Sequence, residues 1–370
     1  MTGSTGAAEA GPTDDGRSGR VELVGSWLLL VALLCENFGV VWDVQWHDDV
    51  GPDTFFTAPH MLIYTAPALA GLTSVFVVLH NTFRASRTSA GGGSVRVLGV
   101  FRAPVGFLVA GVGGAVELAY GLADLWWHTV YGFDVTLNSP PHVGLALGGM
   151  AICVGAILAF VALRRRRAGR WGLAASVSVS LCSMIFALFW AQPFPVSVTP
   201  ICVFCLVMIA GVTRRPGWVT LAGLLFLATQ AAGWVFAPWI TRVYADSVGL
   251  PFRDNASLNP YLPSLYPMVL PVIAVLIEVG VLIGRRSGTS PKAALPVVGA
   301  VVGAGMYVGY TVQFGDAVSV PLAALVAALG AAAGWLGWRA SFPLRRLGPA
   351  GPPPVSPGSS GATSSTAVVV

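Results

Sequence analysis

The sequence carries little charge for its length. Asp, Glu, Lys and Arg make up only 10% of its 370 residues, whereas a soluble globular domain carries about 25%. Hydrophobic residues make up 55%, and the mean hydropathy is +0.74. This composition excludes an assembly of soluble domains and indicates a protein that lies in a lipid bilayer.

Three further features are missing. The five cysteines are an odd number and lie mostly inside apolar segments, which excludes a disulfide framework. The first residues lack a basic stretch, an apolar run and a small-residue cleavage site in succession, so we expect no cleaved signal peptide. We find no nucleotide, haem or iron–sulfur motif, so an oxidoreductase with this sequence would take electrons from a partner.

The apolar residues fall into repeated blocks of about 20 residues, the length at which a helix crosses a bilayer. They predict an all-α fold, a polytopic transmembrane helical bundle of about ten spans. We place the spans near residues 24–46, 59–80, 103–127, 142–163, 172–191, 198–213, 217–239, 264–284, 293–313 and 319–338.

The basic residues lie on one side of these spans. Of 21 Lys and Arg residues, 19 precede the first span, follow the tenth, or lie after the second, fourth, sixth and eighth. Only Arg242 and Arg253 fall on the opposite side. The positive-inside rule therefore predicts a multi-pass protein of the cell membrane with both termini in the cytoplasm. The net charge of +5 follows from this topology, and we expect no nucleic-acid partner.

Composition divides the chain into four parts. Residues 1–20 and 348–370 are rich in small and polar residues or proline, and we expect two disordered tails. Between them we predict a duplicated four-helix metal-binding region over 21–170 and a six-helix membrane region of unknown role over 171–347.

The first four predicted spans contain an internal repeat. One copy runs from Glu36 to His60 and the other from Glu117 to His142. Glu, Asp, Trp, His, Gly and Asp recur at an offset of 81 residues, and a closing Pro-His recurs at 82. Four of the five histidines lie in these copies. We interpret the copies as a duplicated metal-site hairpin, with its loop on the outer face of the membrane.

In each copy, one carboxylate and two histidines should converge at the outer end of the hairpin. Asp43 and His47 are four residues apart and share one helix face. Gly51 and Asp53 are typical turn formers of the loop that follows. The next helix begins with a Pro-His pair, which places His60 at the depth of the first two side chains. The second hairpin repeats this set with Asp124, His128 and His142.

Ionisable side chains inside a membrane need compensation. Each costs about 2.5–3.5 kcal/mol at the bilayer centre, whereas a structural metal site contributes about 10–16 kcal/mol. One carboxylate and two imidazoles also leave coordination positions open for water, dioxygen or substrate. We therefore expect one or two bound ions, and the ligand types leave copper, zinc and iron open. Glu36 and Glu117, which lie one or two turns deeper, are expected to hydrogen-bond to the ligands or to carry protons.

The first copy resembles the third-subunit family of the particulate methane and ammonia monooxygenases, which are copper-dependent membrane enzymes. That family carries an Asp-x3-His-x12-His set around a Trp-His pair, and Asp43, His47 and His60 match it in spacing. The family's next set is Asn-x3-His-x13-His. Its spacing is matched by Asp124, His128 and His142, with Asp in place of Asn.

The resemblance covers about residues 24–164. It implies two neighbouring copper sites in the bilayer, further membrane subunits and an electron donor. The six predicted spans after residue 171 have no counterpart in the resemblance.

Three functions are compatible with these motifs. The first is a component of a membrane oxidase or monooxygenase, a copper-dependent enzyme subunit for a small apolar substrate that enters from the lipid. The second is a non-catalytic copper-binding or copper-transporting protein, in which His47, Asp43 and Glu36 line an ion path. The third is a zinc-dependent membrane hydrolase, in which zinc-bound water attacks the substrate.

Overall fold

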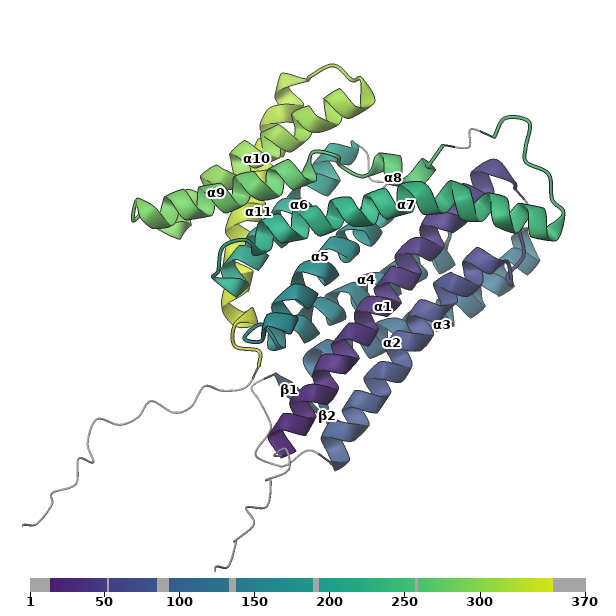
Figure 1. Cartoon of the computed structure of the whole chain (residues 1–370), viewed down its shortest axis with the longest axis horizontal. Coiled ribbons are helices and arrows are strands. Elements are labelled where there is room, and N and C mark those ends of the chain that lie inside the picture. The colour runs from purple at the N-terminus through teal and green to yellow at the C-terminus, as the bar shows by residue number, and fades with distance from the viewer. Residues whose placement is uncertain are drawn as a thin grey trace, which may run out of the picture.

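A computed structural model describes residues 14–51, 53–84, 93–132, 138–188, 193–256 and 259–348. In these residues the chain forms eleven helices and one short two-stranded hairpin (Figure 1). Nine of the helices in this part are long and apolar enough to cross a membrane. The prediction of an all-α, polytopic membrane protein in contact with a lipid bilayer is therefore confirmed.

The first four long helices form two consecutive helical hairpins. They are α1 (Asp14–Asp49) with α2 (Ala58–Phe83), and α3 (Val105–Tyr131) with α4 (Pro140–Ala162). The remaining helices are α5 (Arg167–Ala187), α6 (Phe194–Thr213), α7 (Trp218–Val248), α8 (Tyr261–Leu265), α9 (Leu270–Arg286), α10 (Pro291–Phe314) and α11 (Val320–Leu344). In Figure 1, α5 and α7 lie between the first four helices and the group formed by α9, α10 and α11.

The predicted span over 264–284 is not one continuous helix, because the helix is interrupted near its start. The short helix α8 ends there, Tyr266 is extended with φ −72° and ψ 141°, and α9 then runs for only 17 residues. Pro267 explains the break, because a residue before proline is disfavoured in the helical region. Helix α9 is about 26 Å long and is not among the nine candidate spans of the described residues.

Two side-chain amides, those of the buried Gln230 and the partly buried Gln313, satisfy the backbone at this break. Gln230 Nε2 donates to the carbonyl oxygens of Pro263 at 2.9 Å and Tyr266 at 3.2 Å. Gln313 Nε2 donates to the carbonyl oxygens of Ser264 at 2.7 Å and Tyr266 at 3.0 Å. Irregular backbone inside a membrane protein persists where such internal partners exist. The break is therefore held by side chains from α7 and α10.

Two other boundaries differ from the predictions. Helix α1 begins at Asp14, so part of the predicted tail over 1–20 is helical. The strands β1 (Ser94–Val97) and β2 (Phe101–Pro104) pair as an antiparallel hairpin between α2 and α3. Residues 1–13 and 349–370, which hold most of the two predicted tails, lie outside the described residues.

The basic residues gather at one end of the bundle. Arg166 Nη1 donates to Gly19 O at 2.9 Å, and the guanidinium of Arg164 donates to carbonyl oxygens of the segment after α11. The start of α1, the α4–α5 connection and the end of α11 therefore lie together. Arg253 lies at the other end, where its N–H donates to Asp49 O at 2.8 Å.

Helices α3 and α4 pack with their backbones in near contact. A Cβ atom added at Gly155 would lie 2.5 Å from Ala110 N and 2.7 Å from Gly106 O. A Cβ atom added at Gly106 would lie 2.5 Å from Ala159 N. Small residues allow this close approach of helices in membranes, and it fixes α3 against α4 below the candidate site.

We predict that Gly155→Val destabilises the purified protein by about 1–3 kcal/mol, because overpacking forces α3 and α4 apart. Gly71→Val is the matched control, since nothing lies within 4 Å of a Cβ atom at that helical position. Thermal unfolding in detergent measures both. Equal melting temperatures for the two variants would contradict the close packing.

Candidate metal centre

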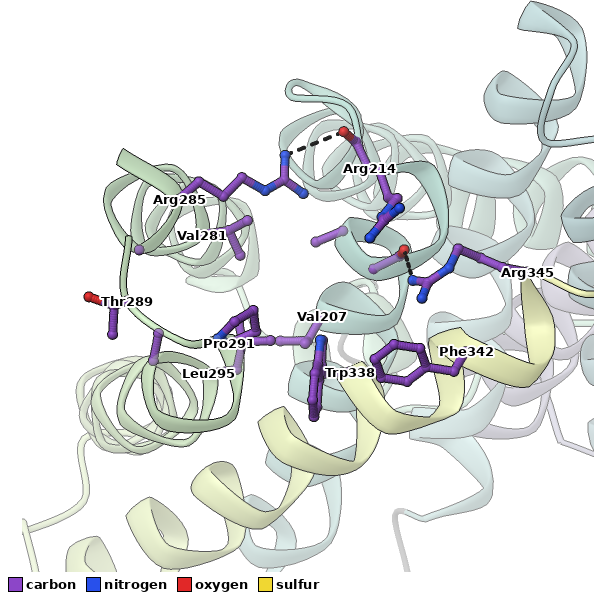
Figure 2. A pocket seen from close by; sticks show the side chains of 14 residues that line it. Val207, Arg214, Val281, Arg285, Thr289, Pro291, Leu295, Trp338, Phe342 and Arg345 are labelled. Atoms are coloured by element: carbon purple, nitrogen blue, oxygen red, sulfur yellow. Dashed lines mark hydrogen bonds between the residues drawn. The ribbon is translucent and has the colours of Figure 1, made fainter. Parts of the chain in front are cut away.

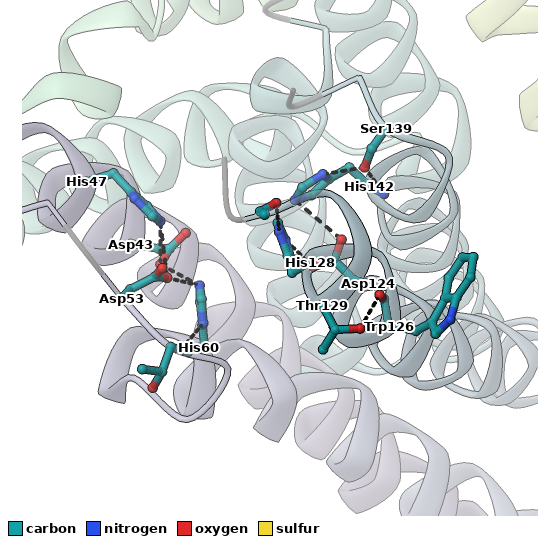
Figure 3. A network of polar contacts seen from close by, with 12 residues as sticks. Asp43, His47, Asp53, His60, Asp124, Trp126, His128, Thr129, Ser139 and His142 are labelled. Carbon is teal, nitrogen blue, oxygen red and sulfur yellow. Dashed lines mark hydrogen bonds and ion pairs between the residues drawn. The ribbon is translucent and has the colours of Figure 1, made fainter. Parts of the chain in front are cut away.

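The first group of possible ligands lies where α1 ends and α2 begins. His60 Nε2 lies 3.1 Å from Asp43 Oδ1 and 3.0 Å from Asp53 Oδ2. His47 Nε2 lies 3.8 Å from Asp43 Oδ1 and 3.4 Å from Asp53 Oδ2. One ligand atom from each of the four residues lies within 4.8 Å of all the others. The predicted set is thus brought together, and a second carboxylate joins it (Figure 3).

The second group lies at the corresponding ends of α3 and α4. Asp124 Oδ2 lies 3.2 Å from His128 Nε2, and Asp124 Oδ1 lies 3.9 Å from His142 Nε2. The two imidazole centroids are 5.9 Å apart. The three residues meet the same 4.8 Å limit. All three residues that the second repeat predicts therefore converge.

Backbone carbonyl groups orient two of the imidazoles. His60 Nδ1 lies 3.0 Å from Thr54 O, and His128 Nδ1 lies 3.0 Å from Gly132 O. A carbonyl oxygen only accepts, so Nδ1 carries the proton in both rings. In the neutral ring this leaves the lone pair on Nε2, which is the atom that faces the carboxylates. Histidines that bind metals are commonly oriented in this way.

Ser139 orients the imidazole of His142. Its Oγ lies 2.7 Å from His142 Nδ1 and accepts from His142 N at 3.4 Å as the N-cap of α4. The same hydroxyl therefore fixes the start of the helix and the position of the ring. Ser139 was not among the predicted site residues, although Ser is a preferred N-cap residue.

The donor atoms fit a small metal ion. Ligands about 2.0–2.2 Å from an ion in a tetrahedral site lie about 3.3–3.6 Å from one another, and the nitrogen–oxygen distances here are 3.0–3.9 Å. The Oδ1 atoms of Asp53 and Asp124 are buried and accept no hydrogen bond from the described residues. Such orphaned carboxylate oxygens are costly unless a cation pairs with them. Both groups can therefore hold a metal ion, and these ligand types suit zinc, copper and iron.

Asp53 was predicted only as a turn former. Its side chain is 1% exposed and points at both histidines of the first group. A signal was present in the sequence, because Asp53 recurs as Asp134 at the offset of 81 residues that relates the ligands. Asp134 lies outside the described residues.

The surroundings keep Asp53 ionised. Burial raises the pKa of this loop carboxyl, but His47 beside it and the charges of His47, His60 and His128 lower the pKa below its usual range. An ionised carboxylate is the form that binds a metal. The influence of His128 also means that the two groups lie within electrostatic reach of each other, at the same end of the bundle.

The aromatic side chain of Tyr64 lies near the first group and contacts the helix that carries the second. The Tyr64 ring is 6.1 Å from the His60 ring, one turn along α2. A Cβ atom added at Gly121 of α3 would lie 3.8 Å from Tyr64 Cε1. Gly121 precedes Asp124 by three residues, so Tyr64 links the first group to the helix that carries the second.

Glu36 and Glu117 lie deeper in the bundle than the two groups. Each precedes its aspartate by seven residues, or about 10 Å along the helix axis, which is too far for a direct hydrogen bond. Their side chains are buried, and Oε2 of each accepts no hydrogen bond from the described residues. The Glu36 carboxylate lies against Gly149 of α4, and Glu117 packs on the neighbouring Gly148. The two predicted roles of Glu36 and Glu117, hydrogen bonding to the ligands and proton carriage, stay predictions.

Comparison of the chain with protein-family models, curated proteins and solved structures gave no match. The resemblance to the third-subunit family of the monooxygenases therefore stays a prediction.

We predict that Asp53→Asn weakens metal binding at the first group at least tenfold. The substitution removes one of the two negative charges that face the ion and retains the size of the side chain. Asp254→Asn, an exposed residue in another loop, is the control. Competition titration with a metal-binding dye measures the affinity, and an unchanged affinity in Asp53→Asn would show that Asp53 is no ligand.

Proposed function

We propose that this chain is a copper-binding membrane protein and a component of an oxidase or monooxygenase for a small apolar substrate. The observation that carries the proposal is the pair of Asp/His groups at one end of the bundle. Each presents imidazole nitrogens and orphaned carboxylate oxygens toward a common point. The choice of copper comes from the resemblance of the two motifs.

A duplication accounts for the two groups. Each hairpin takes an Asp and a His four residues apart from the end of one helix, and a second His from the proline-led start of the next. The copies are related by the 81- and 82-residue offsets. We infer that one ancestral hairpin was repeated and that each copy retained its ligands.

The proposed topology has ten spans, with α9 as the shortest. Both termini and the basic end of the bundle lie in the cytoplasm, and the metal groups lie toward the outer face. Hydrogen bonds that join Arg166 to Gly19 and Arg164 to the segment after α11 support a common basic side. Further membrane subunits and an electron donor complete the enzyme.

The residues of this chain would hold the ion, orient it and move protons. Asp43, His47, Asp53 and His60 form one site, and Asp124, His128 and His142 form the other. Bound copper would supply the activation of dioxygen. Insertion of one oxygen atom into a substrate consumes two electrons and two protons and releases water. The partner would supply the electrons, and Glu36 and Glu117 would pass protons from the bundle interior toward the sites.

A copper-transport function is the second candidate. The observation that favours it is the depth of Glu36 and Glu117, whose buried carboxylates continue inward from the two groups. An ion could follow these oxygens into the bundle. A zinc-dependent membrane hydrolase is the third candidate, since zinc accepts the same ligands.

We predict copper-dependent oxygen consumption in membranes that contain the full-length chain and a reductant. A His60→Ala, His142→Ala variant should lose this activity, because each site loses one imidazole. His80→Ala, which changes the one histidine outside both groups, should retain it. Copper uptake into vesicles without oxygen consumption would establish the transport function instead, and activity restored by zinc alone would establish the hydrolase.

We predict that Asp124→Asn retains metal at the second site. The monooxygenase family has Asn at this position, and an amide oxygen can still face His128 and His142. Metal analysis of the purified variant measures the retention. Complete loss of metal from the second site would show that the carboxylate charge is required there and would contradict this part of the resemblance.

A further inference from the structure

A cavity of about 540 Å³ lies at the basic end of the bundle, far along the chain from the metal groups. Residues of α6, α9, α10 and α11, with Arg214 after α6 and Arg345 after α11, line it (Figure 2). The repeated motifs of the first half of the chain do not extend to this region, and the proposed metal chemistry does not use it.

The inner wall of the cavity is apolar. Val207 of α6, Val281 of α9 and Leu295 of α10 contribute aliphatic side chains. Trp338 and Phe342 of α11 contribute two aromatic rings, whose centroids are 4.8 Å apart. A wall of this kind suits a hydrocarbon chain and leaves a small hydrophilic ion without contacts.

Three arginines surround the same cavity. Arg285 Nη1 donates to Arg214 O at 3.3 Å, and Arg345 Nη1 donates to Gly211 O at 2.7 Å. The Arg345 guanidinium also lies 4.6 Å from the centroid of the Phe342 ring. These contacts position the guanidinium groups of Arg285 and Arg345. No carboxylate forms an ion pair with any of the three arginines within the described residues, so their positive charge has no ionic partner there.

Several positively charged groups act together at the cavity. Burial and the charge of Arg214 lower the pKa of Arg345 from its usual value, and the group stays protonated at neutral pH. Helix α10 begins at Pro291, which also lines the cavity, so the positive end of its dipole adds to the field. An anion is the complement that these groups lack.

We propose that this cavity binds an anionic phospholipid, with the phosphate at Arg214, Arg285 and Arg345 and part of an acyl chain along the apolar wall. Guanidinium groups recognise phosphate through paired, charge-assisted hydrogen bonds. Basic pockets between transmembrane helices are typical sites for anionic headgroups. The arginines lie at the ends of α6, α9 and α11, where the headgroup layer of a bilayer would meet the protein.

Free phosphate shares the headgroup chemistry but fits the cavity less well. It would contact the arginines and leave Val207, Val281 and Trp338 uncovered. A lipid satisfies both parts of the cavity. It would also join the short helix α9 to α6 and α11, so lipid binding should stabilise the folded protein as any ligand of the native state does.

The test uses the full-length protein in detergent and measures thermal unfolding during titration with phosphatidylglycerol, phosphatidylcholine or inorganic phosphate. Phosphatidylglycerol should raise the melting temperature of the wild type by several degrees, and the other two should not. An Arg214→Gln, Arg285→Gln variant should bind phosphatidylglycerol at least tenfold more weakly. The control is Arg215→Gln, Arg286→Gln, which changes the exposed neighbours outside the cavity and should respond like the wild type.

Several results would overturn the proposal. If phosphatidylcholine raised the melting temperature as much as phosphatidylglycerol, the headgroup charge would have no role. If inorganic phosphate alone raised it equally, the cavity would be a simple anion site. If the control variant lost as much affinity for phosphatidylglycerol as the cavity variant, binding would depend on the overall surface charge and not on the cavity. If the cavity variant does not fold, mass spectrometry of lipids that copurify with the wild type decides, since an absence of bound anionic lipid contradicts the proposal.

Discussion

Burial of carboxylates beside imidazoles at one end of a membrane bundle is the constraint on which the rest of the site depends. The Asp53 side chain is 1% exposed, and Oδ1 of Asp53 and Oδ1 of Asp124 each accept no hydrogen bond from the described residues. Charge in such a place is costly unless a partner offsets it. Histidines at 3.0–3.9 Å provide part of that compensation, and a metal ion would complete it. The ends of α1 and α3, the starts of α2 and α4 and the loop that carries Asp53 hold these carboxylates and imidazoles together.

The second half of the chain supports the first metal group. Trp46 of α1 packs with Tyr244 of α7 at a centroid distance of 4.9 Å, and Tyr244 Oη accepts a hydrogen bond from Ala58 N, where α2 begins. Arg253, in the loop after α7, donates through its N–H to Asp49 O. Helix α7 and the loop after it therefore brace both helix ends that carry the first group. This assigns a structural role to part of a region whose sequence suggested none.

Helices and site residues could be predicted from the sequence where the pattern was periodic or repeated. The apolar blocks predicted all nine helices of the described residues that are long and apolar enough to cross a membrane. The repeat predicted which Asp and His residues converge. The break before α9 depends on Pro267 together with amides of Gln230 and Gln313 from distant helices, so no local pattern described it. Asp53 was missed because aspartate is common in turns, and its recurrence was the better guide. The arginine cavity was missed because each arginine alone fits the charge rule for topology, and only the packing of separate connections brings them together.

Metal binding by the two Asp/His groups is tested most simply by the metal content of the purified full-length protein after copper loading. The wild type is compared with a variant that carries His47→Ala, His60→Ala, His128→Ala and His142→Ala, and His80→Ala is the control. We expect one or two copper equivalents in the wild type and the control, and none in the fourfold variant. Equal copper in all three proteins, or no metal in a folded wild type, would contradict it.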